Sequence, residues 1–226
     1  MTFVTTRPIM QACWLSLFQK LIVMQVAIVK YNAGNVYSVV NAVRRLGIEP
    51  VLTDDPVLLR QADRVIFPGQ GEARTAMEYL HQHGLVEVIR SLQQPVLGIC
   101  IGQQLLCSHS EEGDVDCIGI FDAEVKRFQP QRHEDKVPCM GWNRIEVRGE
   151  KPEVRNLFAG LGEDPYVYFV HSYYVPLCND TAAVSDYILP YSAALQKDNF
   201  YTCQFHPEKS GSVGERILRN FIELKN

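Results

Sequence analysis

The chain has 226 residues, of which 46% are hydrophobic and 21% charged, an ordinary globular composition with enough length to bury one substantial core. Its formal net charge is −4 and its basic residues are scattered among acidic ones, which argues against a broad phosphate-binding surface. No apolar run approaches the roughly 20 residues that a transmembrane helix needs. We therefore expect neither a nucleic acid nor a membrane as a partner.

The cysteines favour a reducing compartment. There are seven of them, they form no CxxC pair, and their odd number fits poorly with a closed set of disulfide bonds. We predict free thiols and a cytoplasmic location.

The first 23 residues differ in pattern from the rest of the chain. Arg7 precedes an apolar stretch, ACWLSLF, but Lys20 interrupts it and no small-residue cleavage site comes after it, so an upstream start codon explains the segment better than a targeting role. The next segment, MQVAIVKYNAGN, begins with its own methionine. We predict an extension of unknown role at 1–23 and a single domain at 24–226.

The first half of the domain alternates between strand and helix patterns. A strand from Met24 leads through a glycine-bearing turn to a helix with apolar spacing over 36–46. A short strand at 49–53, a helix started by Asp55 and Pro56, and a strand within 64–71 that ends in a glycine loop come next. Two amphipathic stretches and the strand PVLGIC come after these. This alternation predicts a largely parallel sheet covered by helices, with ligand sites at the carboxyl ends of the strands.

After residue 120 the pattern changes to short β-type runs, which we predict to be antiparallel strands added to the same sheet. These runs are AEVKRF, NRIEV, YVYFVHSYYV, AAVSDY, AALQKD and FYTCQF. A final helix over 213–224 should pack an apolar face on the core. That face consists of Val213, Ile217, Leu218, Phe221 and Ile222.

One segment has the form of a nucleophile elbow. In Gly98-Ile99-Cys100-Ile101-Gly102 the cysteine stands where a buried strand ends and a helix pattern begins, with a small residue on each side. The helix N-terminus would favour the thiolate form of Cys100. A free cysteine alone is more often a small buried hydrophobe, but here the glycines, the strand and the helix start agree.

A thiolate nucleophile needs a base, and His206 is the best candidate. It follows the run FYTCQF and precedes Pro207, which keeps the local chain extended and places Glu208 on the same face. Glu208 can then fix the imidazole tautomer that presents the other nitrogen to sulfur. By itself His-Pro-Glu would read as a polar turn. His171 has no carboxylate near it in sequence, which suits it better to a pocket wall.

An acyl intermediate also needs an oxyanion hole, which two backbone N–H groups usually provide. We expect one from Ile101 and the other from the loop PGQG at 68–71. An ordinary strand-to-helix turn explains PGQG equally well when that segment is considered alone.

Five segments together resemble a known family. PGQG, GICIGQQLL, KVPCMGWN, YFVHSYY and QKDNFYTCQFHPEKSG are similar to class I, triad-type glutamine amidotransferases over about residues 24–226. GICIGQQ and FHPE resemble the whole class, whereas MGWN, FVHSYY and HPEKSG in this order resemble the glutaminase subunits of imidazole glycerol phosphate synthase. The resemblance implies a flavodoxin-like α/β fold, with a mixed, mostly parallel sheet covered by helices and added antiparallel strands.

The resemblance also implies an activity. Such a subunit hydrolyses L-glutamine to glutamate and ammonia through a thioester on the cysteine, and needs no metal or organic cofactor. The ammonia passes to a cyclase subunit with a (β/α)8 barrel, its partner in a heterodimer that serves histidine biosynthesis. There it reacts with a ribulosyl aminoimidazole-carboxamide nucleotide.

Site residues come from the resemblance position by position. Cys100, His206 and Glu208 correspond to the catalytic triad, and Ile101 and Gln70 to the oxyanion hole. The residues that resemble substrate contacts and the oxyanion strand are Gly69, Gln70, Gly71, Gln104, His171, Ser172 and Tyr173. Those that resemble the face toward the cyclase are Asn32, Asn35, Met140, Trp142, Tyr168 and Lys209.

Three segments of the domain depart from the family pattern. Gln70 stands where valine is common, the elbow reads GICIGQQ in place of GICLGMQ, and Cys139 stands where histidine is common. Three other functions stay open from the sequence. One is the glutaminase of another pathway, such as purine, anthranilate or pyridoxal phosphate synthesis. The second is a free-standing cysteine amidohydrolase or peptidase, and the third a catalytically silent binding subunit.

Overall fold

The computed structural model describes residues 24–31, 36–69, 71–148 and 152–224. The extension predicted at 1–23 lies outside these ranges, and so do Asn32, Asn35 and Gln70. None of the helices in the described part of the chain is long and apolar enough to cross a membrane.

The elements within these ranges alternate between strands and helices in the first half of the chain. The strands are β1 (Val26–Val29), β2 (Val51–Thr53), β3 (Arg64–Phe67), β4 (Val96–Ile99), β5 (His109–Ser110), β6 (Val115–Asp116), β7 (Glu124–Arg127), β8 (Cys139–Arg144), β9 (Glu146–Val147), β10 (Tyr166–His171), β11 (Tyr173–Tyr174), β12 (Thr181–Asp186), β13 (Pro190–Lys197) and β14 (Phe200–Cys203). The helices are α2 (Val36–Arg45), α3 (Pro56–Gln61), α4 (Ala73–Gln82), α5 (Leu85–Arg90), α6 (Ile101–Leu105), α7 (Pro152–Leu157), the 3-10 turn η1 (Pro207–Lys209) and α8 (Gly211–Glu223).

Eight of the described strands form the main sheet, in the order β2-β1-β3-β4-β14-β13-β12-β9. The first five strands in this order, β2, β1, β3, β4 and β14, run parallel to one another. Each of the last three, β13, β12 and β9, runs antiparallel to the strand before it in the order. β1, β3, β4 and β14 are buried along their whole length, as expected of central parallel strands covered on both faces. The predicted mixed, mostly parallel sheet is confirmed.

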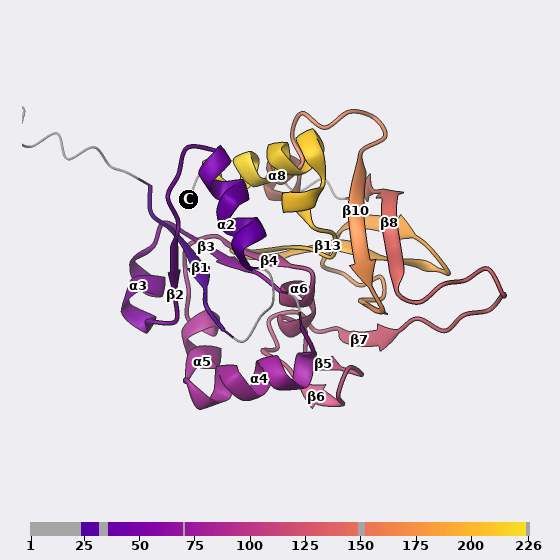
Figure 1. Ribbon diagram of the computed structural model, residues 1–226, viewed down its shortest axis with the longest axis horizontal. Coiled ribbons are helices and arrows are strands. Elements are labelled where there is room, and N and C mark those ends of the chain that lie inside the picture. Colours follow the sequence, from indigo (N-terminus) through magenta and orange to yellow (C-terminus); the bar gives the residue numbers. More distant parts are fainter. Residues whose placement is uncertain (1–23, 32–35, 70, 149–151, 225–226) are drawn as a thin grey trace, which may run out of the picture.

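Helices cover both faces of this sheet (Figure 1). Alternate residues of β1 divide between the two layers: Val26 and Ile28 belong to the core cluster with α2 and α8, while Ala27 and Val29 belong to the cluster with α3 to α6. The apolar face predicted for the last helix is confirmed, since four of its five residues are buried and Val213 packs partly against them.

The second half of the chain corrects one prediction. The later strands do not all join the main sheet: β8 and β10 form a two-stranded sheet, and β11, β7, β5 and β6 form a four-stranded one. β14 does join the main sheet but pairs parallel with β4. The predicted run 166–175 breaks at Ser172 into β10 and β11, which belong to different sheets. Apolar and β-branched patterns mark strands, but packing with distant segments selects their partners.

Candidate active site

Cys100 occupies a sharp turn between β4 and α6, at the carboxyl edge of the main sheet. Its φ of 54° and ψ of −110° lie in a region that residues other than glycine rarely adopt, so the turn is strained. The flanking glycines are sterically required. A Cβ on Gly98 would come within 2.9 Å of the Gly102 carbonyl oxygen, and a Cβ on Gly102 would overlap the Phe67 carbonyl oxygen. The turn thus has the geometry of a nucleophile elbow.

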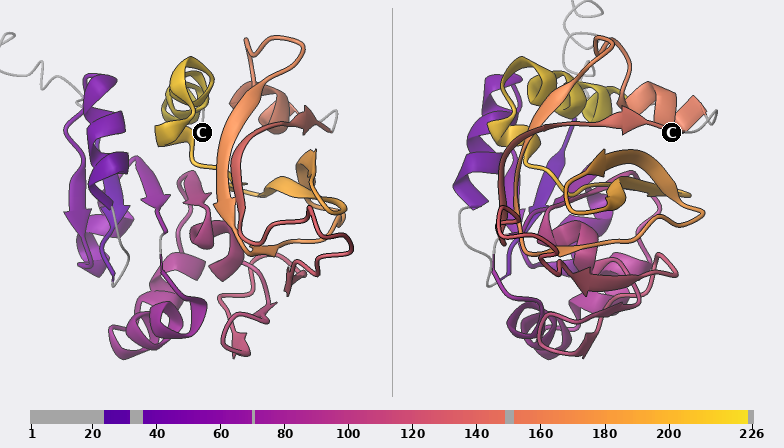
Figure 2. Two further views of the ribbon diagram at one scale, coloured as in Figure 1. Left: turned by 45° about the vertical axis from the view of Figure 1, so that its right-hand side comes forward. Right: turned by 90° about the vertical axis from the view of Figure 1, so that its right-hand side faces the viewer.

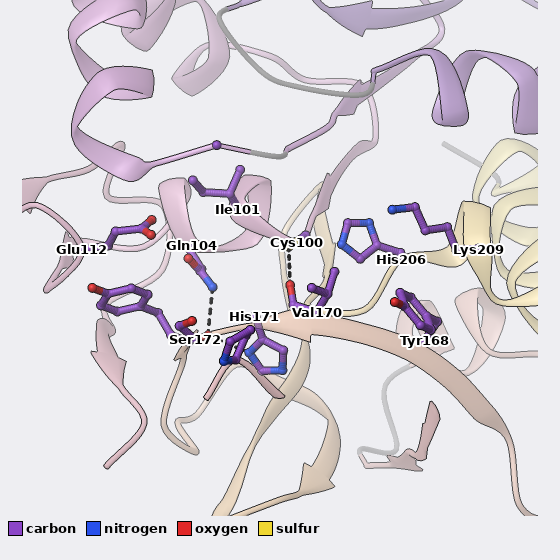
Figure 3. A pocket seen from close by; sticks show the side chains of 13 residues that line it. Cys100, Ile101, Gln104, Glu112, Tyr168, Val170, His171, Ser172, His206 and Lys209 are labelled. Carbon is purple, nitrogen blue, oxygen red and sulfur yellow. Dashed lines mark hydrogen bonds between the residues drawn. The ribbon is translucent and has the colours of Figure 1, made fainter. Parts of the chain in front are cut away.

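His206 and Glu208 form a buried pair beside this turn. Nδ1 of His206 lies 2.8 Å from Oε1 of Glu208, and the two side chains are 1% and 3% exposed. The pairing of β14 with β4 sets Cys203 opposite Ile99 and so brings the segments after both strands to one edge of the sheet. The imidazole of His206 lies next to Cys100 at this edge (Figure 3).

The electrostatics of His206 result from its two neighbours. Burial lowers the pKa of His206, but hydrogen bonding and Coulombic interactions with Cys100 and Glu208 outweigh burial and raise the pKa to about 9. Since Nδ1 pairs with the carboxylate, Nε2 is the nitrogen left for the thiol. Nε2 has no hydrogen bond of ordinary geometry among the described residues. Such bonds are often long before a substrate binds.

The glycine loop after β3 packs directly on the elbow. Gly69 lies so close to Ile101 that a Cβ would overlap the Ile101 side chain. Gly71 lines the cavity next to the elbow and has a φ of 150°, which favours glycine. Ile101 is the first residue of α6, so its N–H has no acceptor within that helix. Gln70, the residue expected to supply the second N–H, is not among the described residues.

A cavity of about 440 Å³ adjoins Cys100 and His206 (Figure 3). Five of the residues expected to contact substrate line it, namely Gly71, Gln104, His171, Ser172 and Tyr173. Tyr168 and Lys209, expected on the partner face, line it as well, whereas Gly69 does not. The structure therefore brings together residues from the elbow, from β10 and β11, and from η1.

Polar contacts fix two side chains of the cavity wall. Nε2 of Gln104 donates to the Tyr173 carbonyl oxygen at 3.0 Å, and Nδ1 of His171 lies 2.7 Å from the same oxygen. Burial lowers the pKa of His171 to about 4, partly offset by its bond to Tyr173. His171 is therefore neutral near pH 7. His206, with its carboxylate partner, is better suited to serve as the base.

Three residues at or near the cavity were not predicted. The Glu112 carboxylate lines the end away from His206 (Figure 3), and burial raises its pKa. It lies between β5 and β6 in a polar segment that gives no functional signal. Gln204 is buried next to the elbow and precedes His206 by two residues, a spacing that could have identified it. The Tyr31 hydroxyl donates to the Pro68 carbonyl oxygen at the start of the glycine loop.

The described residues that are expected to face a partner lie beside the cavity and on the neighbouring β8. Met140 and Trp142 are exposed, and the Trp142 ring meets the Tyr168 ring edge to face with centroids 6.2 Å apart. Cys139 is buried opposite His171 and so does not share in this exposed surface. Among the described residues, no group of three histidine, cysteine, aspartate or glutamate side chains is arranged to hold a metal ion.

The elbow, the buried histidine–glutamate pair and the α/β sheet define a class of protein. The sequence model of the family Glutamine amidotransferase class-I matches residues 27–224, and the chain belongs to that family.

Curated relatives indicate the group within this family to which the chain belongs. A protein of Bacteroides thetaiotaomicron named imidazole glycerol phosphate synthase subunit HisH is 62% identical over 201 residues, which cover 89% of this chain and 100% of the relative. A Yersinia pseudotuberculosis protein of the same name is 44% identical over 202 residues, with 89% and 100% of the two chains covered. Within the class, the chain is therefore a member of the HisH group of glutamine amidotransferases.

Solved structures share the fold at low identity. PurLQS from Thermotoga maritima superposes with a TM-score of 0.64 at 17% identity, over 87% of this chain and 96% of that chain. The glutaminase domain of CTPS from Trypanosoma brucei gives 0.59 at 16% identity, over 90% and 95%. These likenesses support the α/β amidotransferase fold.

Proposed function

We propose that the chain is the glutaminase subunit of an imidazole glycerol phosphate synthase and hydrolyses L-glutamine to L-glutamate and ammonia. The observation that carries the proposal is the buried His206–Glu208 pair beside a strained cysteine elbow, with Cys100 and His206 lining a cavity of about 440 Å³. The 62% identity to a named HisH subunit supports the pathway.

The first half of the reaction makes a thioester. The Cys100 thiolate attacks the side-chain amide carbon of glutamine, a carbon–sulfur bond forms, and the amide oxygen takes the negative charge. The Ile101 N–H and the 68–71 loop, Gln70 included, stabilise that oxyanion. His206, protonated at Nε2, then gives its proton to the departing nitrogen as the carbon–nitrogen bond breaks and ammonia leaves.

The second half hydrolyses the thioester. His206, now neutral, takes a proton from water while the water oxygen attacks the acyl carbon. Collapse of this intermediate breaks the carbon–sulfur bond and releases glutamate and the thiolate. Glu208 holds the imidazole in one tautomer throughout. No step changes an oxidation state, and the thiolate, the imidazole and water account for every bond and proton transfer as written.

The far end of the cavity suits the amino-acid end of the substrate. The Glu112 carboxyl group lies there, and burial disfavours its charged form. The α-ammonium group of a bound amino acid would stabilise the charged carboxylate. Gln104, Ser172 and Tyr173 line the same wall and offer polar groups to the ammonium and carboxylate. Bound in this orientation, glutamine would place its side-chain amide at Cys100.

The partner is a cyclase subunit with a (β/α)8 barrel, in a heterodimer. The face of this chain that docks on the cyclase comprises Met140, Trp142, Tyr168 and Lys209, together with Asn32 and Asn35. Exposed Met140 and Trp142 next to the cavity support this surface, because aromatic residues and methionine are enriched in protein interfaces. Ammonia would leave the cavity on this side. We propose that residues 24–226 form the glutaminase domain and that the complex works in the cytoplasm.

The test is glutamate release from L-glutamine by the purified chain, alone and with a cyclase partner and its nucleotide ligand, with Cys100→Ala as the blank. We expect slow hydrolysis alone, a large increase with partner and ligand, and none in the blank. Rapid hydrolysis by the chain alone would favour a free-standing amidohydrolase. Stimulation only by the synthase of another pathway would favour a glutaminase of that pathway.

A further inference from the structure

Two buried glutamine side chains connect the cavity wall to the Cys100 sulfur. Nε2 of Gln104 donates to the Tyr173 carbonyl oxygen at 3.0 Å and to Oε1 of Gln204 at 2.9 Å. Nε2 of Gln204 in turn donates to Sγ of Cys100 at 3.8 Å. Gln204 is fully buried and Gln104 nearly so. The row runs from Tyr173 on β11 through Gln104 on α6 and Gln204 after β14 to Cys100 at the elbow.

The direction of these hydrogen bonds is fixed at one end. A backbone carbonyl oxygen can only accept, so the atom of Gln104 that meets Tyr173 must be its NH2 group. The second hydrogen of that group then needs an acceptor, which makes the facing atom of Gln204 its oxygen. The NH2 group of Gln204 is thereby directed at Cys100. A flip of Gln104 would set its oxygen against two acceptors, and a flip of Gln204 would set its NH2 group against the NH2 group of Gln104.

This arrangement leaves each member of the row with one role. Both hydrogens of the Gln104 NH2 group are used inside the protein, so toward the cavity Gln104 presents an oxygen, which accepts from an N–H of the substrate. Cys100 receives an N–H that favours its thiolate form, because hydrogen bonds to a charged acceptor are the stronger ones.

A second glutamine on α6 shows that this pattern is particular to Gln204 and Gln104. Gln103 is also fully buried, but its Nε2 donates to the Ser192 carbonyl oxygen at 3.0 Å and its Oε1 accepts from the Thr202 hydroxyl at 2.7 Å. Its partners are therefore in the sheet, and none of them lines the cavity. It offers a matched control for the loss of a buried amide.

We infer that Gln204 is a positioning residue for the glutaminase reaction, an inference that rests on the function proposed above. It holds Gln104 with its oxygen toward the substrate, and it supplies the Cys100 sulfur with a hydrogen-bond donor. Gln204 thus couples substrate recognition to the state of the nucleophile through one side chain.

The test compares Gln204→Leu with Gln103→Leu in two assays. The first measures kcat and KM for L-glutamine in the complex with the cyclase subunit. The second measures the rate at which iodoacetamide alkylates Cys100 in the purified chain at fixed pH, by mass spectrometry of the peptide. For Gln204→Leu we expect kcat/KM to fall roughly 10- to 100-fold, with a raised KM and slower alkylation. For Gln103→Leu we expect kcat/KM and the alkylation rate to stay within about threefold of wild type, since the Gln103 side chain bonds neither Gln104 nor Cys100.

Two further variants separate the two roles. Gln104→Leu should raise KM yet leave alkylation of Cys100 near the wild-type rate, and adding Gln204→Leu should raise KM little more while slowing alkylation. Gln204→Glu keeps the acceptor for Gln104 but, when ionised, cannot donate to sulfur. It should therefore slow alkylation and kcat with KM nearly unchanged, and it also serves if Gln204→Leu fails to fold.

The inference is overturned if the leucine variants at 103 and 204 behave alike in both assays, because the effect would then be loss of a buried amide alone. It is also overturned if the folded Gln204→Glu alkylates at the wild-type rate. Failure of the proposed function has a different signature. The wild-type chain would then alkylate at Cys100 in a Gln204-dependent way but hydrolyse no glutamine with any cyclase.

Discussion

Two regions beside the cavity, a buried inner end and an exposed outer side, consist of different kinds of residue. At the inner end, Cys100, His206 and Glu208 are buried, and hydrogen bonds and a strained backbone turn fix their positions. At the outer side, Met140 is 65% exposed and Trp142 56% exposed. The inner end has the geometry proposed for catalysis, whereas the outer side presents apolar surface that the described residues leave uncovered.

Tyr168 is the residue at which the two regions meet. Its ring packs against the exposed Trp142, while its backbone carbonyl accepts the N–H of His206 at 2.9 Å. Its own N–H donates to the Ser210 hydroxyl at 2.9 Å, and that hydroxyl donates to the His206 carbonyl oxygen. His206, the proposed base, and the exposed surface are thus held by the same stretch of β10. Substitutions at the two ends should nevertheless separate chemistry from docking.

The largest expected effect is loss of the nucleophile. Cys100→Ala should lower glutamine hydrolysis at least ~10⁴-fold, because among the described residues Cys100 is the one cysteine that lines the cavity with His206. Binding to the cyclase subunit, measured by titration calorimetry, should stay within about threefold of wild type since Cys100 lies at the inner end. If the variant no longer binds the cyclase, the division between the two ends is wrong.

Glu208→Gln should have the next largest effect. The amide can still accept or donate a hydrogen bond, but it neither stabilises the imidazolium nor selects the tautomer, so kcat should fall about 10²- to 10⁴-fold. KM for glutamine should change little, because Glu208 does not line the main cavity. Steady-state kinetics of the complex decide the point, and a large rise in KM with kcat unchanged would contradict the assigned role.

Trp142→Ala tests the outer side. Truncation of an exposed aromatic in the docking face should weaken cyclase binding roughly 10- to 100-fold. It should change the unfolding free energy of the isolated chain by less than about 1 kcal/mol. Val57→Ala is the matched control, since Val57 is also exposed and lies in α3 on the opposite side of the molecule (Figure 2). Equal effects of the two substitutions on binding would remove Trp142 from the interface.

The first half of the chain could be predicted from sequence because its signals are local. Asp55 and Pro56 mark the start of α3, and the Asp55 carboxylate does accept the Val57 N–H at 2.7 Å. The elbow could be predicted for the same reason, since the glycines on either side of Cys100 are needed within one turn. His206 and Glu208 are two residues apart, so their proximity also required only a local backbone conformation.

The features that could not be predicted depend on contacts between distant segments. The partner of each later strand is one case, because β10 pairs with β8 and β11 with β7 although β10 and β11 are nearly continuous in sequence. Glu112 is another, since the polar segment around it gives no sign that folding brings it to the cavity. The contacts of Gln204 are a third case: its spacing from His206 indicates a place near the site, but its partners lie 104 and 100 positions earlier in the chain and only the fold brings them together.

The smallest expected effect is on stability, and it should again distinguish the two ends. The folded-state pKa of His206 is about 9, above its ordinary value near 6.5, so the folded protein holds a proton that the unfolded chain releases in this range. The contribution of protonated His206 to the free energy of unfolding is complete below pH 6.5 and is lost as pH rises through 9. Urea unfolding at about pH 6.5 and pH 9 should therefore show wild type losing more stability than Glu208→Gln, by an amount on the order of 1 kcal/mol.

Part of the shift should survive in Glu208→Gln, because Cys100 also raises the pKa of His206. Trp142→Ala, which touches neither group, should lose as much stability as wild type over the same pH interval. A wild type that loses no more than Glu208→Gln would mean that the carboxylate does not hold the proton on His206. A change in this interval for Trp142→Ala would mean that the exposed side and the buried pair are not independent in the free chain.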